Sequence, residues 1–236
     1  MDEKGGALVI HDVIAWFGDG DHWRGPSGVP TLLGQHALLT LVSLLIAAAV
    51  GLPVAIWLGH RGRGGTFAVN LSNVGRAVPI VALLSLLALG VFGTGALGPF
   101  GRSGLATLVT LALFALPPIV TNTYTGITGV DRDMVEAARG MGMSELDVLR
   151  RVELPLALPL IVAGIRLAVV QVWATATIAA LVAGPGLGRI IVHGYDSFQT
   201  AEVVAGSLIV AGVALALELA LALVQKLMDP VPAGSR

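Results

Sequence analysis

Long uninterrupted apolar runs most constrain what this chain can fold into. A helix that crosses the hydrocarbon of a membrane needs about 20 mostly apolar residues, and five stretches of the sequence reach that length, 32–58, 67–92, 105–124, 156–182 and 203–227. None alternates with period two as a barrel strand does, and only helices or closed barrels satisfy backbone polar groups in lipid. The sequence therefore predicts an all-α polytopic membrane protein with about five transmembrane helices.

Composition supports lipid as the solvent and excludes several classes of function. The chain is 55% hydrophobic and 12% charged, whereas a soluble domain carries about 25% charged residues. A formal net charge of −1 gives no sign of nucleic-acid binding. The absence of cysteine excludes disulfide scaffolds, thiolate metal sites and cysteine nucleophiles.

Lysine and arginine predict the orientation, because cytoplasmic loops of membrane proteins are enriched in them. With five spans, the first loop, the third loop and the C-terminus share one side, and they hold eight Lys and Arg residues against four on the opposite side. This distribution predicts a cytoplasmic C-terminus and an N-terminus outside the cell.

The chain divides into three predicted segments. Residues 1–30 form an N-terminal extracytoplasmic segment, residues 31–228 a transmembrane domain, and residues 229–236 a cytoplasmic tail. Within the first segment, residues 7–17 place Leu8, Ile10, Val13, Ile14 and Phe17 near one face of a helix. That pattern predicts an amphipathic helix lying in the membrane interface; a loosely ordered tail is the alternative.

The segment 131–155, between the third and fourth apolar stretches, predicts two short helices at an angle. Asp133 with Glu136 resembles a capping box, and Gly142 is a helix stop. Ser144, with an acid three residues on, is a second N-cap, and this second helix is expected to run to about residue 152. We therefore expect a bent pair of helices projecting into the cytoplasm.

One face of the first predicted helix is apolar. Met134, Ala138 and Met141 share that face at helical spacing. Small and flexible apolar side chains exposed on a polar loop are typical of a docking surface for another protein.

The same segment resembles the coupling loop of the permeases of binding-protein-dependent (type I) ABC importers. Their motif is Glu-Ala-Ala, three residues, Gly, nine residues, Ile, one residue, Leu-Pro, and this chain matches every spacing, with Val in place of Ile. The resemblance implies that the loop sits in a cleft of an ATP-binding subunit and transmits its closure to the membrane helices. The residues expected to couple to the ATPase are Glu136, Ala137, Ala138, Arg139, Gly140, Met141, Gly142, Ser144, Val152, Leu154 and Pro155.

The flanking residues are most similar to the osmoprotectant permeases, which import glycine betaine, carnitine, choline or proline. The similarity rests on the segments 122–126, 136–143, 152–159 and 163–166. It implies a bacterial plasma-membrane location, a dimer of ATPase subunits, a second permease subunit that is identical or paralogous, and an extracytoplasmic solute-binding protein. It also implies that this chain binds no cofactor, because ATP is held by the partner. A methionine or other amino-acid permease is the alternative, since the segment 194–198 resembles that group.

Two other classes of function are less compatible with the sequence. An intramembrane enzyme needs clustered catalytic or ligating residues, but the five histidines, at 11, 22, 36, 60 and 193, are scattered. A secondary transporter normally has inverted repeats and no coupling loop. The chain also lacks the phosphate-binding pattern GxxxxGK[ST], so ATP hydrolysis is expected in a separate subunit.

Charged and polar side chains inside the apolar stretches are candidates for a role in the membrane. Arg76, Arg166 and Glu218 lie at similar predicted depth, and because a lone charge is costly in lipid we expect Glu218 to pair with one of the arginines. Trp173 and Asn73 are candidates for lining the solute pathway, with ordinary helix packing as the alternative for Trp173.

Overall fold

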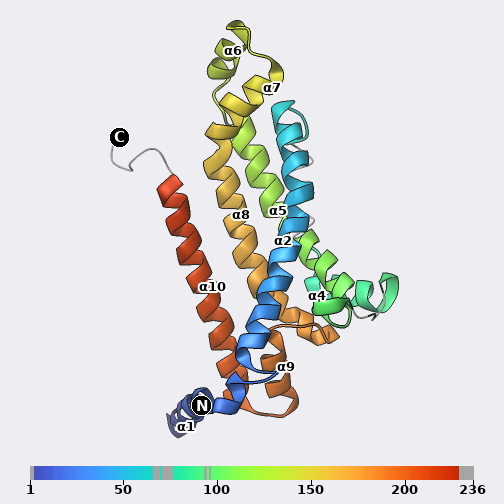
Figure 1. The fold of residues 1–236 in the computed structure, drawn as a ribbon, viewed down its shortest axis with the longest axis vertical. Helices are drawn as coiled ribbons and strands as arrows, with labels where there is room; N and C mark the ends of the chain where they lie inside the picture. The colour runs from blue at the N-terminus through green and yellow to red at the C-terminus, as the bar shows by residue number, and fades with distance from the viewer. Residues whose placement is uncertain (1–2, 66–69, 71–76, 93–94, 96, 229–236) are drawn as a thin grey trace. The chain divides into compact units, whose positions relative to one another are not determined.

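The structure, a computed structural model, describes residues 3–65, 70, 77–92, 95 and 97–228. Within these ranges the chain is a succession of helices (Figure 1). The α-helices are α1 (Glu3–Gly18), α2 (Val29–His60), α4 (Ile80–Leu86), α5 (Gly104–Thr128), α6 (Arg132–Gly140), α7 (Glu145–Val148), α8 (Leu154–Ala176), α9 (Gly188–Asp196) and α10 (Thr200–Met228). Three 3₁₀ segments span Gly20–Trp23, Gly98–Phe100 and Thr177–Val182, and two π-helical turns span Leu87–Val91 and Leu149–Glu153.

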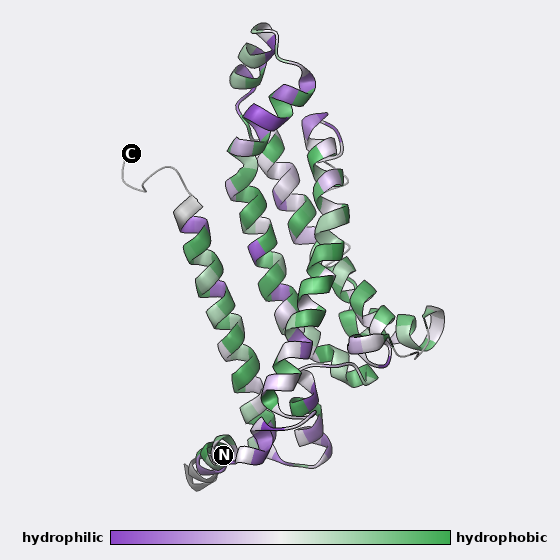
Figure 2. Ribbon diagram, in the orientation of Figure 1, coloured by the Kyte–Doolittle hydropathy of each residue, from purple (hydrophilic) through white to green (hydrophobic). Residues whose placement is uncertain are grey.

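Four helical segments of the described chain are long and apolar enough to cross a membrane. They are Val29–His60, Gly104–Thr128, Glu145–Val182 and Thr200–Lys226, and they overlap the first, third, fourth and fifth apolar stretches of the sequence. Hydrophobic residues dominate these long helices, whereas hydrophilic residues gather on α6 and α7 (Figure 2). The chain is therefore an all-α polytopic membrane protein, as the sequence predicts.

The second apolar stretch, 67–92, does not form one long helix in its described part. The positions 66–69 and 71–76 lie outside the described residues. The helix α4 begins only after Pro79, whose backbone is extended, with ψ at 119°. A proline disfavours helical geometry at the residue before it, so the helix starts there, and its seven residues span only about 10 Å.

The chain is built of two compact units. The first comprises Met1–Ser43, Pro79–Leu111 and Gln171–Leu217, and the second comprises Leu44–Val78, Ala112–Val170 and Glu218–Arg236. Helices α2, α5, α8 and α10 each contribute residues to both. The described lysines and arginines other than Arg166 divide between them: residues 4, 24, 102 and 189 belong to the first unit, and residues 61, 63, 132, 139, 150, 151 and 226 to the second.

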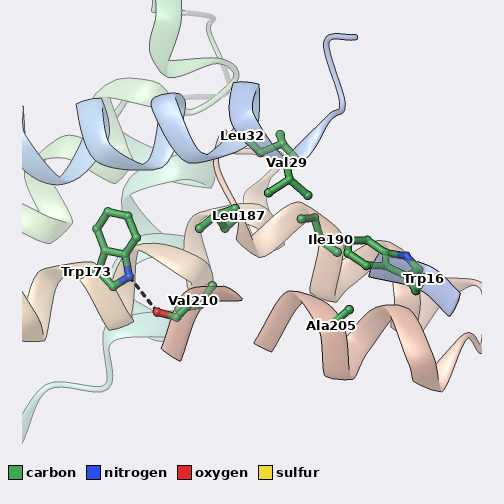
Figure 3. Packing of buried hydrophobic residues seen from close by; sticks show 8 residues of the cluster. All are labelled: Trp16, Val29, Leu32, Trp173, Leu187, Ile190, Ala205 and Val210. Carbon is green, nitrogen blue, oxygen red and sulfur yellow. Dashed lines mark hydrogen bonds between the residues drawn. The ribbon is translucent and has the colours of Figure 1, made fainter. Parts of the chain in front are cut away.

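Apolar side chains from α1, α2, α8, α9 and α10 form a core in the first unit (Figure 3). Its buried members are Trp16, Val29, Leu32, Trp173, Leu187, Ile190, Ala205 and Val210. The two indole rings are the largest side chains of this core, and aromatic side chains bury the largest surfaces. This core includes residues from the N-terminal 30 positions.

Helix α1 turns only part of the predicted apolar face inward, namely Val13 and the partly buried Phe17. Val13 and Trp16 are buried, whereas Ile10 and Ile14, predicted on the same apolar face as Val13, are exposed. The reason is tertiary, because Trp16 packs into the core of the first unit and its large ring sets the rotation of the helix. The exposed isoleucines remain apolar surface of the kind that an interfacial helix offers to lipid.

Helix α9 lies between the fourth and fifth apolar stretches and is not among the helices that the sequence predicts. It packs closely on α10, since a side chain at Gly194 would lie 2.8 Å from Val203 and one at Gly206 would lie 3.0 Å from Ile190. Nine residues are too few to be stable alone in water, so the helix depends on this contact.

Small residues let α2, α5 and α8 approach closely in the second unit. A Cβ at Gly51 would lie 3.1 Å from Leu116, one at Gly59 would lie 2.8 Å from Ile127, and one at Gly164 would lie 2.6 Å from Asn122. Helices in lipid associate through such close backbone contact, because lipid tails are as apolar as the side chains and give no hydrophobic drive. This three-helix packing holds the base of the loop that follows α5.

Candidate functional site

The residues of the coupling motif lie on a loop of two short helices, α6 and α7. Helix α6 is capped by Asp131, whose carboxylate accepts a hydrogen bond from the amide of Asp133 at 2.9 Å. The prediction that Asp133 caps the helix is therefore wrong by two positions. Asp131 is the residue with extended backbone geometry, which leaves its side chain free to reach the first orphan amides, while Asp133 is already helical.

The bend between the two helices lies at Gly142. Its φ is +83°, a left-handed conformation that glycine adopts at little cost. Its amide donates to the carbonyl of Arg139 at 2.9 Å, and Ser144 then caps α7 by accepting from the amide of Asp147 at 3.3 Å. The structure thus places the turn and the second cap at the positions that the sequence predicts.

Alanine substitutions at two glycines of this loop test whether the left-handed conformation of Gly142 makes the bend. Gly142→Ala is expected to destabilise the loop by about 1–2 kcal/mol, because an L-residue is strained in the left-handed region. Gly140→Ala is expected to stabilise α6 by up to about 1 kcal/mol, since Gly140 is helical and a Cβ there meets nothing within 4 Å. Amide hydrogen exchange across residues 132–148 should therefore accelerate in the first variant and slow in the second. Equal effects of the two substitutions would contradict this account of the bend.

The exposed surface of the loop differs from the predicted apolar face in one residue. Met134 and Met141 are exposed, the latter to 77%, but Ala138 is buried at 2%. Ala138 packs with Val135 and Val148 in the small core of the loop itself. The expected docking face therefore loses Ala138, because that side of α6 is needed to hold α7.

Other motif residues of α6 remain accessible. Glu136, Ala137, Gly140 and the bend at Gly142 are exposed, and Leu146 on α7 adds an apolar side chain that is 53% exposed. Flexible methionines beside a carboxylate form a surface that adapts to a partner. The loop thus presents an apolar patch of Met134, Met141 and Leu146 next to the charge of Glu136.

A bidentate ion pair joins α6 to α7 across the bend. Arg139 donates from Nε to Oε1 of Glu145 and from Nη2 to Oε2, each at 2.9 Å. Hydrogen bonding to this carboxylate raises the pKa of Arg139 further above its usual value, so the guanidinium stays charged. Paired N–H···O bonds fix the angle between two groups as well as their distance, which favours the loop moving as one piece.

The last part of the motif joins the loop to the membrane helices. Val152 packs on the loop core, and Leu154 packs with Ile127 and Ile161 of α5 and α8. Because Pro155 has no N–H to donate, the regular ladder is interrupted, and the amide of Leu154 bonds five residues back to Leu149. The π-helical turn leads directly into α8, so the second loop helix ends at Val148 rather than near residue 152.

A histidine that the sequence analysis left without a role contacts this loop. His60, the last residue of α2, lies with its Nδ1 2.5 Å from Oε2 of Glu153. Glu153 occupies a position that the motif leaves open, between Val152 and Leu154. The two residues are 93 positions apart, and no local sequence pattern connects them.

Two cavities open beside this histidine. One of about 260 Å³ is lined by Gly59, His60, Glu136, Arg139 and Glu153 among others. The other, of about 500 Å³, is lined by Trp57, His60, Arg61, Arg63, Arg139 and Glu145. Within the described ranges, no group of three or more His, Asp or Glu side chains is arranged to hold a metal ion.

Arg166 and Glu218 form an ion pair between α8 and α10 in the second unit. Arg166 Nε donates to Oε1 of Glu218 at 3.1 Å, and its Nη2 contacts the same oxygen. A third contact runs from Nη1 to Oε1 of Gln225 at 2.9 Å. The structure thus brings together two of the three charged residues expected to associate, while Arg76, like Asn73, lies outside the described residues.

Trp173, a candidate for the solute pathway, is a packing residue in this structure. It is 3% exposed, and its indole N–H donates to the carbonyl of Val210 at 3.1 Å (Figure 3). Its own carbonyl accepts from Nε2 of His36 at 2.9 Å, and the other nitrogen of that ring accepts from the amide of Leu187 at 3.3 Å. The ring is enclosed and its N–H is paired, as the packing alternative for Trp173 predicts.

Comparison with known proteins identifies the family. Residues 51–231 match the family of binding-protein-dependent transport system inner membrane components. The chain belongs to this family. The choline transport system permease protein OpuBD of Bacillus subtilis is 36% identical over 199 residues, which cover 84% of each chain. The carnitine transport permease protein OpuCD of Listeria monocytogenes is 33% identical over 198 residues, covering 84% of this chain and 85% of the relative.

Solved structures of other permeases of this architecture have the same fold. An inward-facing MetNI methionine ABC transporter aligns with a TM-score of 0.66 over 97% of this chain and 100% of its own, at 20% identity. An amino acid ABC transporter crystallised with histidines aligns with a TM-score of 0.63 over 96% of this chain and 97% of its own, at 18% identity. At these identities the likeness establishes the type I importer permease fold.

Proposed function

We propose that this chain is the membrane subunit of an ATP-driven importer that carries a compatible solute such as glycine betaine, choline, carnitine or proline. The observation that carries the proposal is the identity of 29–36% with permeases named for choline, carnitine and glycine betaine transport, over 84% of the chain. The coupling motif, which matches the family at every spacing, lies on an exposed two-helix loop and supports the same conclusion. A permease needs an exposed surface of this kind to contact the ATPase that drives it.

The partner that the loop fits is an ATP-binding cassette ATPase. The patch of Met134, Met141 and Leu146, beside the carboxylate of Glu136, suits a cleft with an apolar floor and a basic rim. ATP binding and hydrolysis then belong to a dimer of these ATPases, and this chain holds no cofactor. A second permease, identical or paralogous, completes the pathway, and a solute-binding protein delivers the substrate from outside.

The orientation that fits this role places the loop and the C-terminus in the cytoplasm and the N-terminus outside. The second unit, which carries the loop, holds the larger share of the described lysines and arginines, in keeping with their enrichment on the cytoplasmic side. The plasma membrane of a bacterium is the location that suits such an importer.

The substrate class rests on the relatives rather than on a site in this chain. A quaternary ammonium group is recognised by clustered aromatic faces. The chain has six Phe, four Trp and two Tyr, and Trp16 and Trp173 are occupied in the core of the first unit. Solute selection is therefore expected in the binding protein. A methionine permease remains the second candidate, because a methionine transporter shares the fold.

Reconstitution tests both the mechanism and the substrate. The chain is purified with its ATPase and binding-protein partners, placed in liposomes, and assayed for uptake of radiolabelled glycine betaine, choline, carnitine, proline and methionine. The expected result is uptake of a quaternary ammonium solute or proline that requires both ATP and the binding protein. Uptake of methionine alone would support the second candidate. Uptake driven by an ion gradient without ATP would overturn the proposal.

A further inference from the structure

His60 stands between two carboxylates that belong to the coupling loop. Its Nδ1 donates to Oε2 of Glu153 at 2.5 Å, and its Nε2 lies 3.5 Å from Oε2 of Glu145. Glu145 in turn holds Arg139. Polar contacts thus run from the end of α2 to the π-helical turn through Glu153, and separately to α7 and then α6 through Glu145.

Glu153 depends on this contact because it is buried. Only 5% of its surface is exposed, and a buried carboxylate is costly unless a hydrogen-bond donor satisfies it. The side chain of His60 is itself only 15% exposed. The ring and the carboxylate therefore meet in a largely buried setting, where a hydrogen bond is stronger than in water.

The chain topology shows why this contact matters. The loop is covalently continuous with α5 before it and with α8 after it, so any displacement of α6 and α7 reaches those two helices through the backbone. Helix α2 ends at His60 and has no such connection. Its contacts with the other helices of this unit include the packing of Gly51 and Gly59 on α5, and its end is tied to the loop itself by the bridge from His60 to Glu153.

A cavity lies between the end of α2 and α6. The cavity of about 260 Å³ is lined by Gly59 and His60 on one side and by Arg132, Val135 and Glu136 on the other. The hydrogen bond from His60 to Glu153 lies beside this cavity and ties the end of α2 directly to the π-helical turn of the loop, in addition to the packing of α2 on α5.

We propose that the His60–Glu153 bridge is a positioning element that transmits movement of the coupling loop to α2, so that α2 moves together with α5 and α8 when the ATPases close. The inference rests on the proposed role of the loop as the ATPase contact. It assigns to His60 no contact with solute or nucleotide.

The deciding variant removes the bridge without leaving a buried charge unpaired. His60→Phe combined with Glu153→Leu keeps apolar volume at both positions, and replacement of a buried ionic pair by apolar side chains is often neutral for stability. The double variant is therefore expected to assemble with its ATPase and to retain basal ATP hydrolysis. Two apolar side chains can slide past each other, so they do not hold α2 to the loop as the hydrogen bond does. The stimulation of ATP hydrolysis by solute-loaded binding protein is therefore expected to fall about fivefold or more, which is within the usual range of coupling between two sites.

His60→Gln is the conservative control. The glutamine amide can donate to Glu153 much as the imidazole does, so this variant is expected to keep most of the stimulation and of the transport per ATP. A purely structural role for His60 would instead lower the thermal stability of the complex and reduce basal and stimulated hydrolysis in parallel.

The outcomes separate this inference from the proposed function. An undiminished ratio of stimulated to basal hydrolysis in the double variant, with a coupled wild-type complex, would overturn the role of the bridge alone. A wild-type chain that recruits no ATPase would overturn the proposed function itself. If the double variant fails to assemble while His60→Gln assembles with a full ratio, the bridge is structural and the inference is wrong.

Discussion

Replacing Glu218 with leucine is expected to leave little assembled protein in the membrane. The substitution removes the carboxylate that Arg166 contacts through Nε and Nη2, and leaves its contact with Gln225. A guanidinium on a membrane-spanning helix is costly unless it is paired. The amount of chain in purified membranes, measured by immunodetection, should fall severalfold.

The control for this prediction removes both charges. Arg166→Leu together with Glu218→Leu leaves no unpaired ion, and an apolar pair is compatible with the interior of a membrane protein. The double variant should recover most of the membrane-inserted protein that the single Glu218→Leu variant loses. If single and double variants accumulate equally, the pair does not stabilise the chain.

Gly164→Leu is expected to separate α5 from α8 in the second unit. Even a Cβ at this position would lie 2.6 Å from Cβ of Asn122 and 2.8 Å from the carbonyl oxygen of Pro118. The backbone of α5 cannot yield as a flexible side chain does, so the helices must move apart. Overpacking of this kind costs about 1–3 kcal/mol, and thermal unfolding of the purified protein in detergent should shift downwards accordingly.

Gly212→Leu is the matched control within a membrane helix. Gly212 lies in α10, and a Cβ there meets nothing within 4 Å. Glycine to leucine raises helix propensity at both positions by the same amount, so propensity alone predicts that both variants are stabilised. Opposite shifts of the unfolding temperature would show that close packing decides the effect at Gly164. An unchanged unfolding temperature for Gly164→Leu would contradict the packing seen here.

Local sequence patterns predicted much of the secondary structure. Four of the five apolar stretches are long helices, because their length and composition leave the backbone no other way to satisfy its polar groups in lipid. The π-helical turn after α7 and the short α4 were not foreseen, although Pro155 and Pro79 were visible in the sequence. A proline shows that a helix is disturbed there, but its surroundings determine whether the helix widens, stops or begins.

In the candidate site too, local sequence predicts some features, and contacts between distant residues decide the others. The spacing of the motif predicted the bend at Gly142 and the cap at Ser144, since both depend on residues a few positions apart. The burial of Ala138 could not be predicted, because it depends on Val148 of a different helix. His60 and Glu153 carried no signal, since each taken alone is an ordinary polar residue near a helix end.

The sequence by itself determined that this chain is a helical membrane protein with a bent two-helix loop after its third apolar stretch. Helix length, caps and glycine turns are local, and local backbone preferences decide them. Only the tertiary structure decided which distant side chains meet, as Arg166 meets Glu218 and His60 meets Glu153. Such pairs depend on how the helices are rotated and how closely they approach, and those quantities follow from the packing of many residues at once.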